Sequence, residues 1–160
     1  MSPTSIEKDT LRKQMIAVRR QLTASAKKQA DRVITAAVLA RSEVRNATVI
    51  CIYQSFPQEV STGEIIETLI KQKRKIVLPP ASPHKFVGLS AVDVFIIPGV
   101  AFDLSGYRLG RGKGYYDRLL AGVNVQKIGL SYECQIVSGL PHDRYDIPMD
   151  VVITEKKTYG

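Results

Sequence analysis

The chain has 160 residues, of which 44% are hydrophobic and 24% are charged, and it contains no tryptophan. This length and composition predict one soluble domain over residues 1–160, large enough to bury a core. No apolar run approaches the roughly 20 residues that a membrane span needs, and no secretory signal is recognisable. We therefore expect a cytoplasmic protein without a membrane partner.

The net charge of +8, from 23 Lys and Arg against 15 Asp and Glu, favours anionic partners. Nucleic acid, a membrane surface, a polyanionic small ligand or simply a basic solvated surface all remain open on this ground. Cys51 and Cys134 stand inside strand-like runs rather than at metal-ligand or redox spacing, so we interpret both as buried structural thiols.

The first predicted element is a helix that opens at Thr4 and Glu7, which have the spacing of a capping box. Lys8 and Arg12 are one helical turn apart and can converge on one anion, although a solvated basic pair is the more common outcome. The helix is expected to bury the apolar stripe Leu11, Met15, Val18 and Leu22. The basic residues are expected on a different side of it: Lys8, Arg12 and Arg19.

A second helix is predicted over residues 25–41, and the continuous β-branched run 48–53 predicts a strand covered on both faces. Ser61 and Glu64 have capping-box spacing before a further helix, and residues 75–78 predict a short strand. The apolar face of the second helix is expected to comprise Ala30, Val33, Ile34, Ala37 and Val38. The helix after Ser61 carries Ile65, Ile66, Leu69 and Ile70.

Three more strands are predicted over residues 93–97, 127–132 and 151–154, with a helix that contains Tyr115 and Tyr116 between the first two. Strands that alternate with helices favour an α/β layer fold with a mainly parallel sheet.

The densest functional pattern is the glycine-rich run 110–114, in which three glycines alternate with Arg111 and Lys113. Glycine lets backbone N–H groups converge on an anion, and the helix N-terminus that follows suits a phosphate. Arg108 adds a third cation. The glycine spacing fits neither a P-loop nor a dinucleotide fingerprint. We predict that residues 108–117 bind ATP or a close phosphate-bearing relative; the alternative is a flexible basic turn.

Several acids are candidate ligands. Asp117 could hold Mg²⁺ against the phosphates, but a first-turn acid that stabilises the helix dipole is an equal alternative. Glu59 follows a strand, where α/β folds place ligand contacts, although loop acids are usually solvated. One of Asp143, Asp146 and Asp150 could be a metal ligand, although acids of this kind more often form turns.

Two runs resemble the signature of the 5-formyltetrahydrofolate cyclo-ligase family, also called 5,10-methenyltetrahydrofolate synthetases. They are residues 97–103 (Ile-Pro-Gly-Val-Ala-Phe-Asp) and 108–117 (Arg-Leu-Gly-Arg-Gly-Lys-Gly-Tyr-Tyr-Asp). Lys8-x-x-x-Arg12 and residues 59–62 and 146–155 resemble further family segments in the same order, so the resemblance spans nearly the whole chain.

The resemblance implies a three-layer α/β/α sandwich and an ATP- and Mg²⁺-dependent ring closure. In the family, ATP phosphorylates the formyl oxygen of 5-formyltetrahydrofolate. The bridge nitrogen of the folate then attacks the activated carbon, and phosphate leaves to give 5,10-methenyltetrahydrofolate. Phosphoryl transfer requires mainly positioning and charge neutralisation from the protein.

The resemblance also implies residue roles. Asp117 and Asp146 would hold Mg²⁺, and Gln54 and Glu59 would face the folate together with residues 111–115. The residues implied in catalysis are Arg111, Lys113 and Tyr115. The nucleotide would be held by Lys8, Arg12, Arg108, Leu109, Gly110, Arg111, Gly112, Lys113, Gly114, Tyr115 and Tyr116.

The sequence departs from the family pattern at two places. Only twelve residues separate Pro80 from Asp93, where relatives carry a longer stretch with a Met or aromatic residue against the pterin; Phe86 is a candidate substitute. Tyr145 stands where relatives commonly have His.

Two alternatives follow for the function. A same-fold, ATP-dependent enzyme could act on a different acceptor, or the +8 chain could be a nucleic-acid-binding module, for which no supporting motif is present. We expect small-molecule partners, ATP and a reduced folate, and a monomer.

Overall fold

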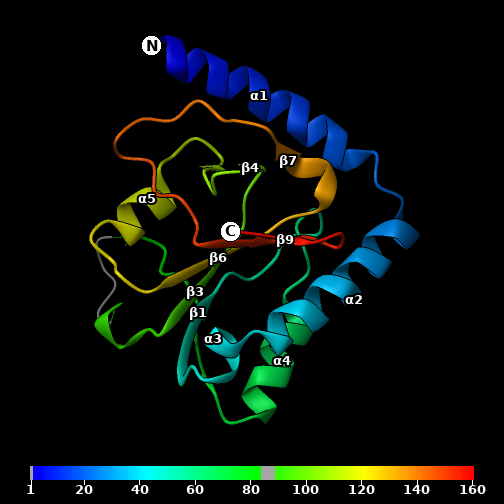
Figure 1. The fold of residues 1–160 in the computed structure, drawn as a ribbon, viewed down its shortest axis with the longest axis vertical. Helices are drawn as coiled ribbons and strands as arrows, with labels where there is room; N and C mark the ends of the chain where they lie inside the picture. Colours follow the sequence, from blue (N-terminus) through cyan, green and yellow to red (C-terminus); the bar gives the residue numbers. More distant parts are fainter. Residues whose placement is uncertain (1, 84–88) are drawn as a thin grey trace.

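The structure is a computed structural model and describes residues 2–83 and 89–160. Within these residues, six strands form a central sheet in the order β2-β1-β3-β6-β8-β9 (Figure 1). Five of them run parallel, and β9 at the edge is antiparallel to β8. The predicted mainly parallel α/β sheet is therefore confirmed. The strands are β1 (Val49–Ile52), β2 (Lys75–Val77), β3 (Val94–Ile97), β6 (Gln126–Leu130), β8 (Val151–Ile153) and β9 (Thr158–Tyr159).

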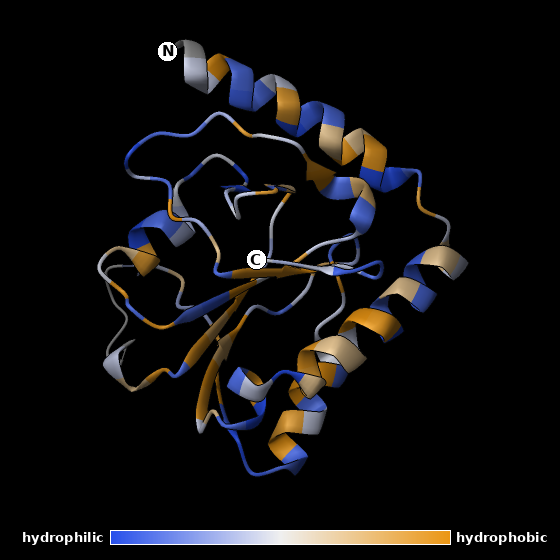
Figure 2. Cartoon of the chain, viewed as in Figure 1, coloured by the Kyte–Doolittle hydropathy of each residue, from blue (hydrophilic) through white to orange (hydrophobic). Residues whose placement is uncertain are grey.

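One face of the sheet is covered by α2 (Ala24–Ala40), α3 (Ser42–Arg45) and α4 (Gly63–Lys71). Successive strand residues point to opposite faces, so Ile50 and Ile52 join the core on this side while Cys51 faces the other. The central strands are mostly apolar because both of their faces are covered (Figure 2).

The opposite face carries α5 (Tyr115–Leu120) and a small sheet in the order β5-β4-β7. Phe102 of β4 fastens this small sheet to the central one, because its fully buried ring lies against Gly129 of β6. A Cβ at residue 129 would stand 2.5 Å from that ring. The remaining elements are β4 (Ala101–Asp103), β5 (Arg108–Leu109), β7 (Ile136–Val137), η2 (Leu89–Ala91) and η3 (Glu133–Gln135).

The first helix, α1 (Pro3–Arg20), packs on the outside of the small sheet (Figure 1). Met15 is buried there with Leu109 of β5 and Leu140. Because β5 leads directly into the glycine-rich run, this packing brings α1 beside that run.

The helix caps and two apolar positions differ from the sequence prediction. Ser2 rather than Thr4 caps α1, and its side chain accepts a hydrogen bond from the Ser5 N–H at 3.2 Å. Thr62 rather than Ser61 precedes α4, and its hydroxyl donates instead to the Tyr53 carbonyl. Val18 and Val33, predicted to be buried, are 36% and 44% exposed because they lie at the margins of the covered helix faces.

The basic residues of α1 were expected on a different side from its apolar stripe, and this prediction is wrong. Lys8, Arg12 and Arg19 are each half-buried, on the same side as the buried Met15. Residue 15 follows residue 8 by seven positions, and at about 3.6 residues per turn the two return to nearly the same direction.

Four short strands, β4, β5, β7 and β9, were not predicted. Two or three residues are too few to show the alternation of apolar and polar side chains that indicates a strand. Across residues 2–83 and 89–160, none of the helices combines the length and apolar character that spanning a membrane requires.

Candidate active site

A cavity of about 880 Å³ opens at the carboxyl ends of three parallel strands. Gln54 follows β1, Pro79 follows β2 and Gly99 follows β3, and all three line it. The run 110–114 and the inward side of α1 complete the wall. The edge formed by strand carboxyl ends is where open α/β sheets bind their ligands.

Every residue to which the resemblance assigns a role in the site lines this one cavity, although the chain separates them by up to 138 positions. Their individual roles stay predictions. Asp150, a further candidate metal ligand, is not in the lining, and its carboxylate accepts from the Lys127 N–H instead. The lining includes Lys8, Arg12, Gln54, Glu59, Arg108, Leu109, Gly110, Arg111, Gly112, Lys113, Gly114, Tyr115, Tyr116, Asp117 and Asp146.

The glycine-rich run lies directly against α1. Gly112 and Gly114 adopt positive φ values of 102° and 62°, which side chains with a Cβ rarely tolerate. A Cβ on Gly112 would stand 3.3 Å from the guanidinium carbon of Arg12. The Nε of Arg12 donates to the Gly110 carbonyl at 2.6 Å, and its guanidinium also pairs with Asp9. Glycine is therefore needed both for the turn and for the close approach of the two elements.

Arg108 is a half-buried cation in the cavity wall. Its Nη1 donates to the Pro98 carbonyl at 3.2 Å, and its guanidinium lies 5.0 Å from the centre of the Tyr116 ring. Burial lowers the pKa of Arg108, and the neighbouring Asp117 carboxylate raises it. The buried Nε has no hydrogen-bond partner within the described part of the chain. A fixed positive charge therefore underlies the cavity floor.

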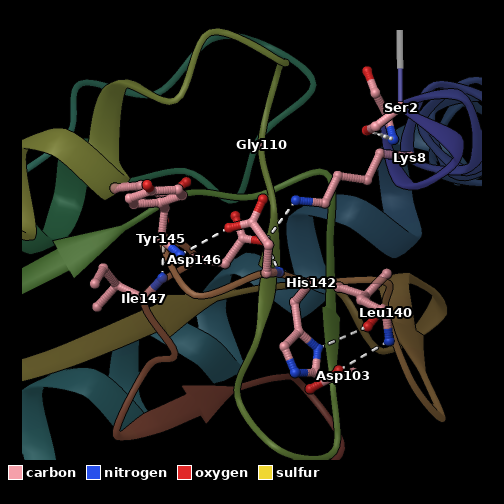
Figure 3. Close-up of polar contacts among 12 residues, drawn as sticks. Ser2, Lys8, Asp103, Gly110, Leu140, His142, Tyr145, Asp146 and Ile147 are labelled. Carbon is pink, nitrogen blue, oxygen red and sulfur yellow. Dashed lines mark hydrogen bonds and ion pairs between the residues drawn. The ribbon is translucent and has the colours of Figure 1, made fainter.

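Asp117 and Asp146 are held by the same loop. The carboxylate of Asp146 accepts from the Lys8 ammonium at 2.6 Å and from the Asp143 N–H at 2.9 Å (Figure 3). Asp117 accepts from the Ile147 N–H at 3.1 Å. The residues described here include no group of three or more acids, His or Cys that would bind a metal. Mg²⁺ usually takes one or two carboxylates and completes its octahedron with phosphate and water, so this pair fits it.

Glu59 lies at the other side of the cavity. It is 8% exposed, and its Oε1 accepts from the Phe56 N–H at 2.9 Å. The Arg111 guanidinium stands 3.6 Å from the same oxygen and 4.5 Å from the centre of the Phe56 ring, with its side chain 61% exposed. The arrangement pairs a sheltered acceptor with a solvent-facing cation.

Tyr115 ties α5 to the end of β2. Its hydroxyl donates to the Pro80 carbonyl, and its ring meets Tyr116 edge to face at 5.0 Å. Burial raises the pKa of the Tyr115 hydroxyl, which keeps it a neutral donor at physiological pH. Phe56 and Leu78, each about half exposed, add apolar surface to the wall.

Sequence reasoning missed Arg19, Phe56 and Leu78 as cavity residues. The only available signal was that Arg19 follows Lys8 by eleven positions, about three helical turns. Tyr145 is 66% exposed and does not belong to the lining. The predicted substitute Phe86 lies outside the described residues.

The pattern of the 5-formyltetrahydrofolate cyclo-ligase family matches residues 4–89 and 80–155. The chain belongs to this family. Its members are ATP-dependent ligases. The two matches overlap within the segment between Pro80 and Asp93, so the family pattern is interrupted where this chain is short.

Curated relatives and solved structures agree with this membership. The 5-formyltetrahydrofolate cyclo-ligase of Haemophilus influenzae is 30% identical over 182 aligned positions, which cover 92% of this chain and 97% of that protein. The structure of Aquifex aeolicus 5,10-methenyltetrahydrofolate synthetase matches with a TM-score of 0.83 and 31% identity, over 95% of this chain and 91% of that chain.

The 5,10-methenyltetrahydrofolate synthetase of Mycoplasma pneumoniae is informative about length. Its structure matches with a TM-score of 0.82 and 29% identity, over 93% of this chain and 99% of that one. The cyclo-ligase of that organism aligns over 165 positions that cover it completely. A relative that carries the family name is therefore close to this chain in length.

Proposed function

We propose that this chain closes 5-formyltetrahydrofolate to 5,10-methenyltetrahydrofolate, with conversion of ATP to ADP and phosphate. The observation that carries the proposal is the convergence of five separated family segments on one cavity at the strand ends. The cavity is also large enough for extended ligands, since binding sites commonly measure 300–1,000 Å³.

The nucleotide half of the proposal rests on the glycine-rich run and α1. Arg12 and Arg108 are fixed by hydrogen bonds to backbone carbonyls, while Arg111 and Lys113 are exposed at the cavity, where they would meet phosphate oxygens. Phosphoryl transfer needs charge neutralisation and alignment more than covalent help from the protein. The four cations and the glycine N–H groups would supply both.

Mg²⁺ would be held by Asp117 and Asp146 together with the ATP phosphates, where it would neutralise charge on the phosphoryl group as that group is transferred. Asp146 already faces a cation, the Lys8 ammonium. Lys8 is therefore placed beside the proposed metal ligand, where its ammonium could also meet the phosphates.

The reaction itself follows from the substrate chemistry. The formyl oxygen attacks the γ-phosphorus and ADP leaves, so that the carbon carries a phosphate ester oxygen as a leaving group. The bridge nitrogen then attacks this carbon, loses its proton, and phosphate departs with the former formyl oxygen. Tyr115, Arg111 and Lys113 would surround the transferred phosphoryl group and stabilise its negative charge.

The folate half rests on Glu59, Gln54 and the apolar wall. The Glu59 carboxylate is an acceptor for ring N–H groups, and Phe56 and Leu78 offer apolar faces for a flat ring. We also propose that the protein works as a cytoplasmic monomer on small molecules; its free cysteines agree with a reducing compartment.

The test is to mix purified protein with Mg-ATP and 5-formyltetrahydrofolate and to follow ADP release and methenyltetrahydrofolate absorbance together. Equal formation of the two products is expected. ATP binding without ring closure would contradict the folate assignment and favour a different acceptor. Absence of both, with tight RNA or DNA binding at physiological salt, would favour the nucleic-acid alternative.

A further inference from the structure

Arg19 is a third cation on the cavity side of α1. It lies in the last turn of the helix, lines the cavity, and follows Arg12 by seven residues, so that the two side chains leave the helix in nearly the same direction. Lys8, Arg12 and Arg19 thus form a row about 16 Å long at 1.5 Å per residue. Lys8 and Arg12 belong to the nucleotide half, and Arg19 stands at the far end of the row.

The Nε of Arg19 is shielded from water and makes no hydrogen bond within the described part of the protein. Leaving a buried donor unpaired is costly, and more so for a charged group. A side chain kept in this state at the wall of a binding cavity is typical of one whose acceptor arrives with the ligand.

The two acidic residues that the Tyr132 hydroxyl contacts, Asp31 and Glu59, are already engaged by other donors. Asp31 accepts from Lys27 at 2.8 Å, from the Tyr132 hydroxyl at 2.6 Å and from the Ser61 N–H at 3.2 Å. Glu59 Oε1 accepts from the Phe56 N–H and faces Arg111. A purely structural ion pair therefore does not account for Arg19.

The surroundings indicate which part of a substrate Arg19 would meet. Arg19, Glu59 and Arg111 line the same cavity. Burial lowers the pKa of Arg19, the charge of Glu59 raises it, and that of Arg111 lowers it. Tyr132, fully buried, adjoins Arg19 and Glu59: its hydroxyl contacts the Glu59 carbonyl at 3.2 Å, and it too raises the pKa of Arg19. Phe56, whose N–H binds Glu59, offers an apolar face to a flat ring in this cavity, whereas a charged glutamate tail would extend toward water.

We propose that Arg19 is a substrate-binding residue that donates to the ring carbonyl oxygen of the reduced pterin, beside the N–H groups that Glu59 accepts. The 2-amino-4-oxo edge of a pterin presents N–H donors and a carbonyl acceptor side by side. A carboxylate next to a guanidinium is the complementary pair. The inference rests on the proposed function, because it takes a reduced folate as the substrate.

The test compares steady-state kinetics of Arg19→Ala, Arg19→Lys and a matched control, Arg20→Ala, whose side chain is exposed on the same turn. In Arg19→Ala the KM for 5-formyltetrahydrofolate is expected to rise about tenfold to a hundredfold, as for loss of a charged hydrogen bond, with the KM for ATP unchanged. Lys at residue 19 should recover part of the loss, and Arg20→Ala should match wild type.

The KM for ATP distinguishes loss of a folate contact from damage to α1. Lys8 and Arg12 lie on the same helix and are proposed to bind the nucleotide, so a distorted helix would raise the KM for ATP as well. An equal rise in both KM values, or no change in either, would overturn the inference. The same comparison with 5-formyltetrahydropteroate, which lacks the glutamate tail, should give the same loss; if the loss disappears, Arg19 binds the tail instead. Wild-type protein that neither closes the ring nor binds the reduced folate would overturn the proposed function itself.

Discussion

At the scale of residues, the cavity is shaped by side chains that bind backbone carbonyls across it. Arg12 donates to the Gly110 carbonyl, Arg108 to that of Pro98, and the Tyr115 hydroxyl to that of Pro80. These contacts join α1, β3 and β2 to the glycine-rich run and to α5. Arg111 and Lys113 are different, because both are exposed, and Arg111 faces side chains: the Glu59 carboxylate at 3.6 Å and the Phe56 ring at 4.5 Å.

This difference predicts the behaviour of the double variant Arg111→Ala, Lys113→Ala. Loss of the two exposed cations should lower ATP turnover by about a hundredfold or more, since single charge-stabilising donors are often worth that much. The free energy of unfolding should change by only about 0.5 kcal/mol, as is usual for surface positions. Coupled ADP release and urea unfolding measure the two quantities.

The matched control removes two exposed cations from α2, far from the cavity lining: Lys28→Ala, Arg32→Ala. It keeps the same net charge as the test variant and should retain full turnover. Equal activity in the two double variants would show that the glycine-rich run does not bind the nucleotide.

At the scale of elements, the small sheet β5-β4-β7 connects the site to the core. Phe102 packs between Gly99 and Gly129, and a Cβ at either glycine would stand within 2.7 Å of its ring. On its other side the small sheet supports α1 through Leu109 and Met15. The run 110–114 is thus held by β5 below and α1 beside it, which explains how a glycine-rich segment keeps one shape.

We expect Phe102→Ala to lower the free energy of unfolding by about 3–5 kcal/mol, the usual cost of emptying a buried aromatic site. Phe102→Leu, which keeps more apolar volume, should cost less. Phe56→Ala is the control, because Phe56 is 54% exposed and should cost little. Urea unfolding of the three variants measures their free energies of unfolding. A loss of stability in Phe102→Ala similar to that in Phe56→Ala would contradict the prediction.

At the scale of the whole molecule, the central sheet is sealed on both faces. Cys51 of β1 is 1% exposed, within the core that lies beneath α5 and the small sheet. Burial raises the pKa of its thiol to about 12 from an ordinary 9.0. The native state holds the thiol proton of Cys51 more tightly than the unfolded state does. The protonated thiol therefore adds to the free energy of unfolding below pH 9, and this addition is lost as the pH rises toward 12.

Cys51 should therefore react with an alkylating agent only when the molecule unfolds. In a Cys134→Ser variant, labelling by iodoacetamide at pH 8 should be negligible without denaturant and should follow the unfolding transition in urea. Rapid labelling of Cys51 in the native protein would show that the layers on this face open locally.

From the sequence, the long helices and strands and the candidate site residues were easier to predict than the positions of these elements relative to one another. The runs at β1, β3 and β8 were readable because parallel strands covered on both faces are continuously apolar. The candidate site residues were readable because glycines, cations and acids stood at strand ends. Ser2 as the cap of α1, and Thr62 before α4, were not, because competing hydroxyls stood next to them and distant contacts selected between these positions.

What the sequence by itself determined is the α/β alternation, the parallel sheet and the phosphate-suited run 108–117, since each follows from local pattern and backbone freedom. Only the tertiary structure decided that the cations of α1 face inward, that two- and three-residue strands pair, and that Arg19 and Glu59 line the same cavity. These features depend on contacts between segments far apart in the chain, and such contacts leave no period in the sequence around them.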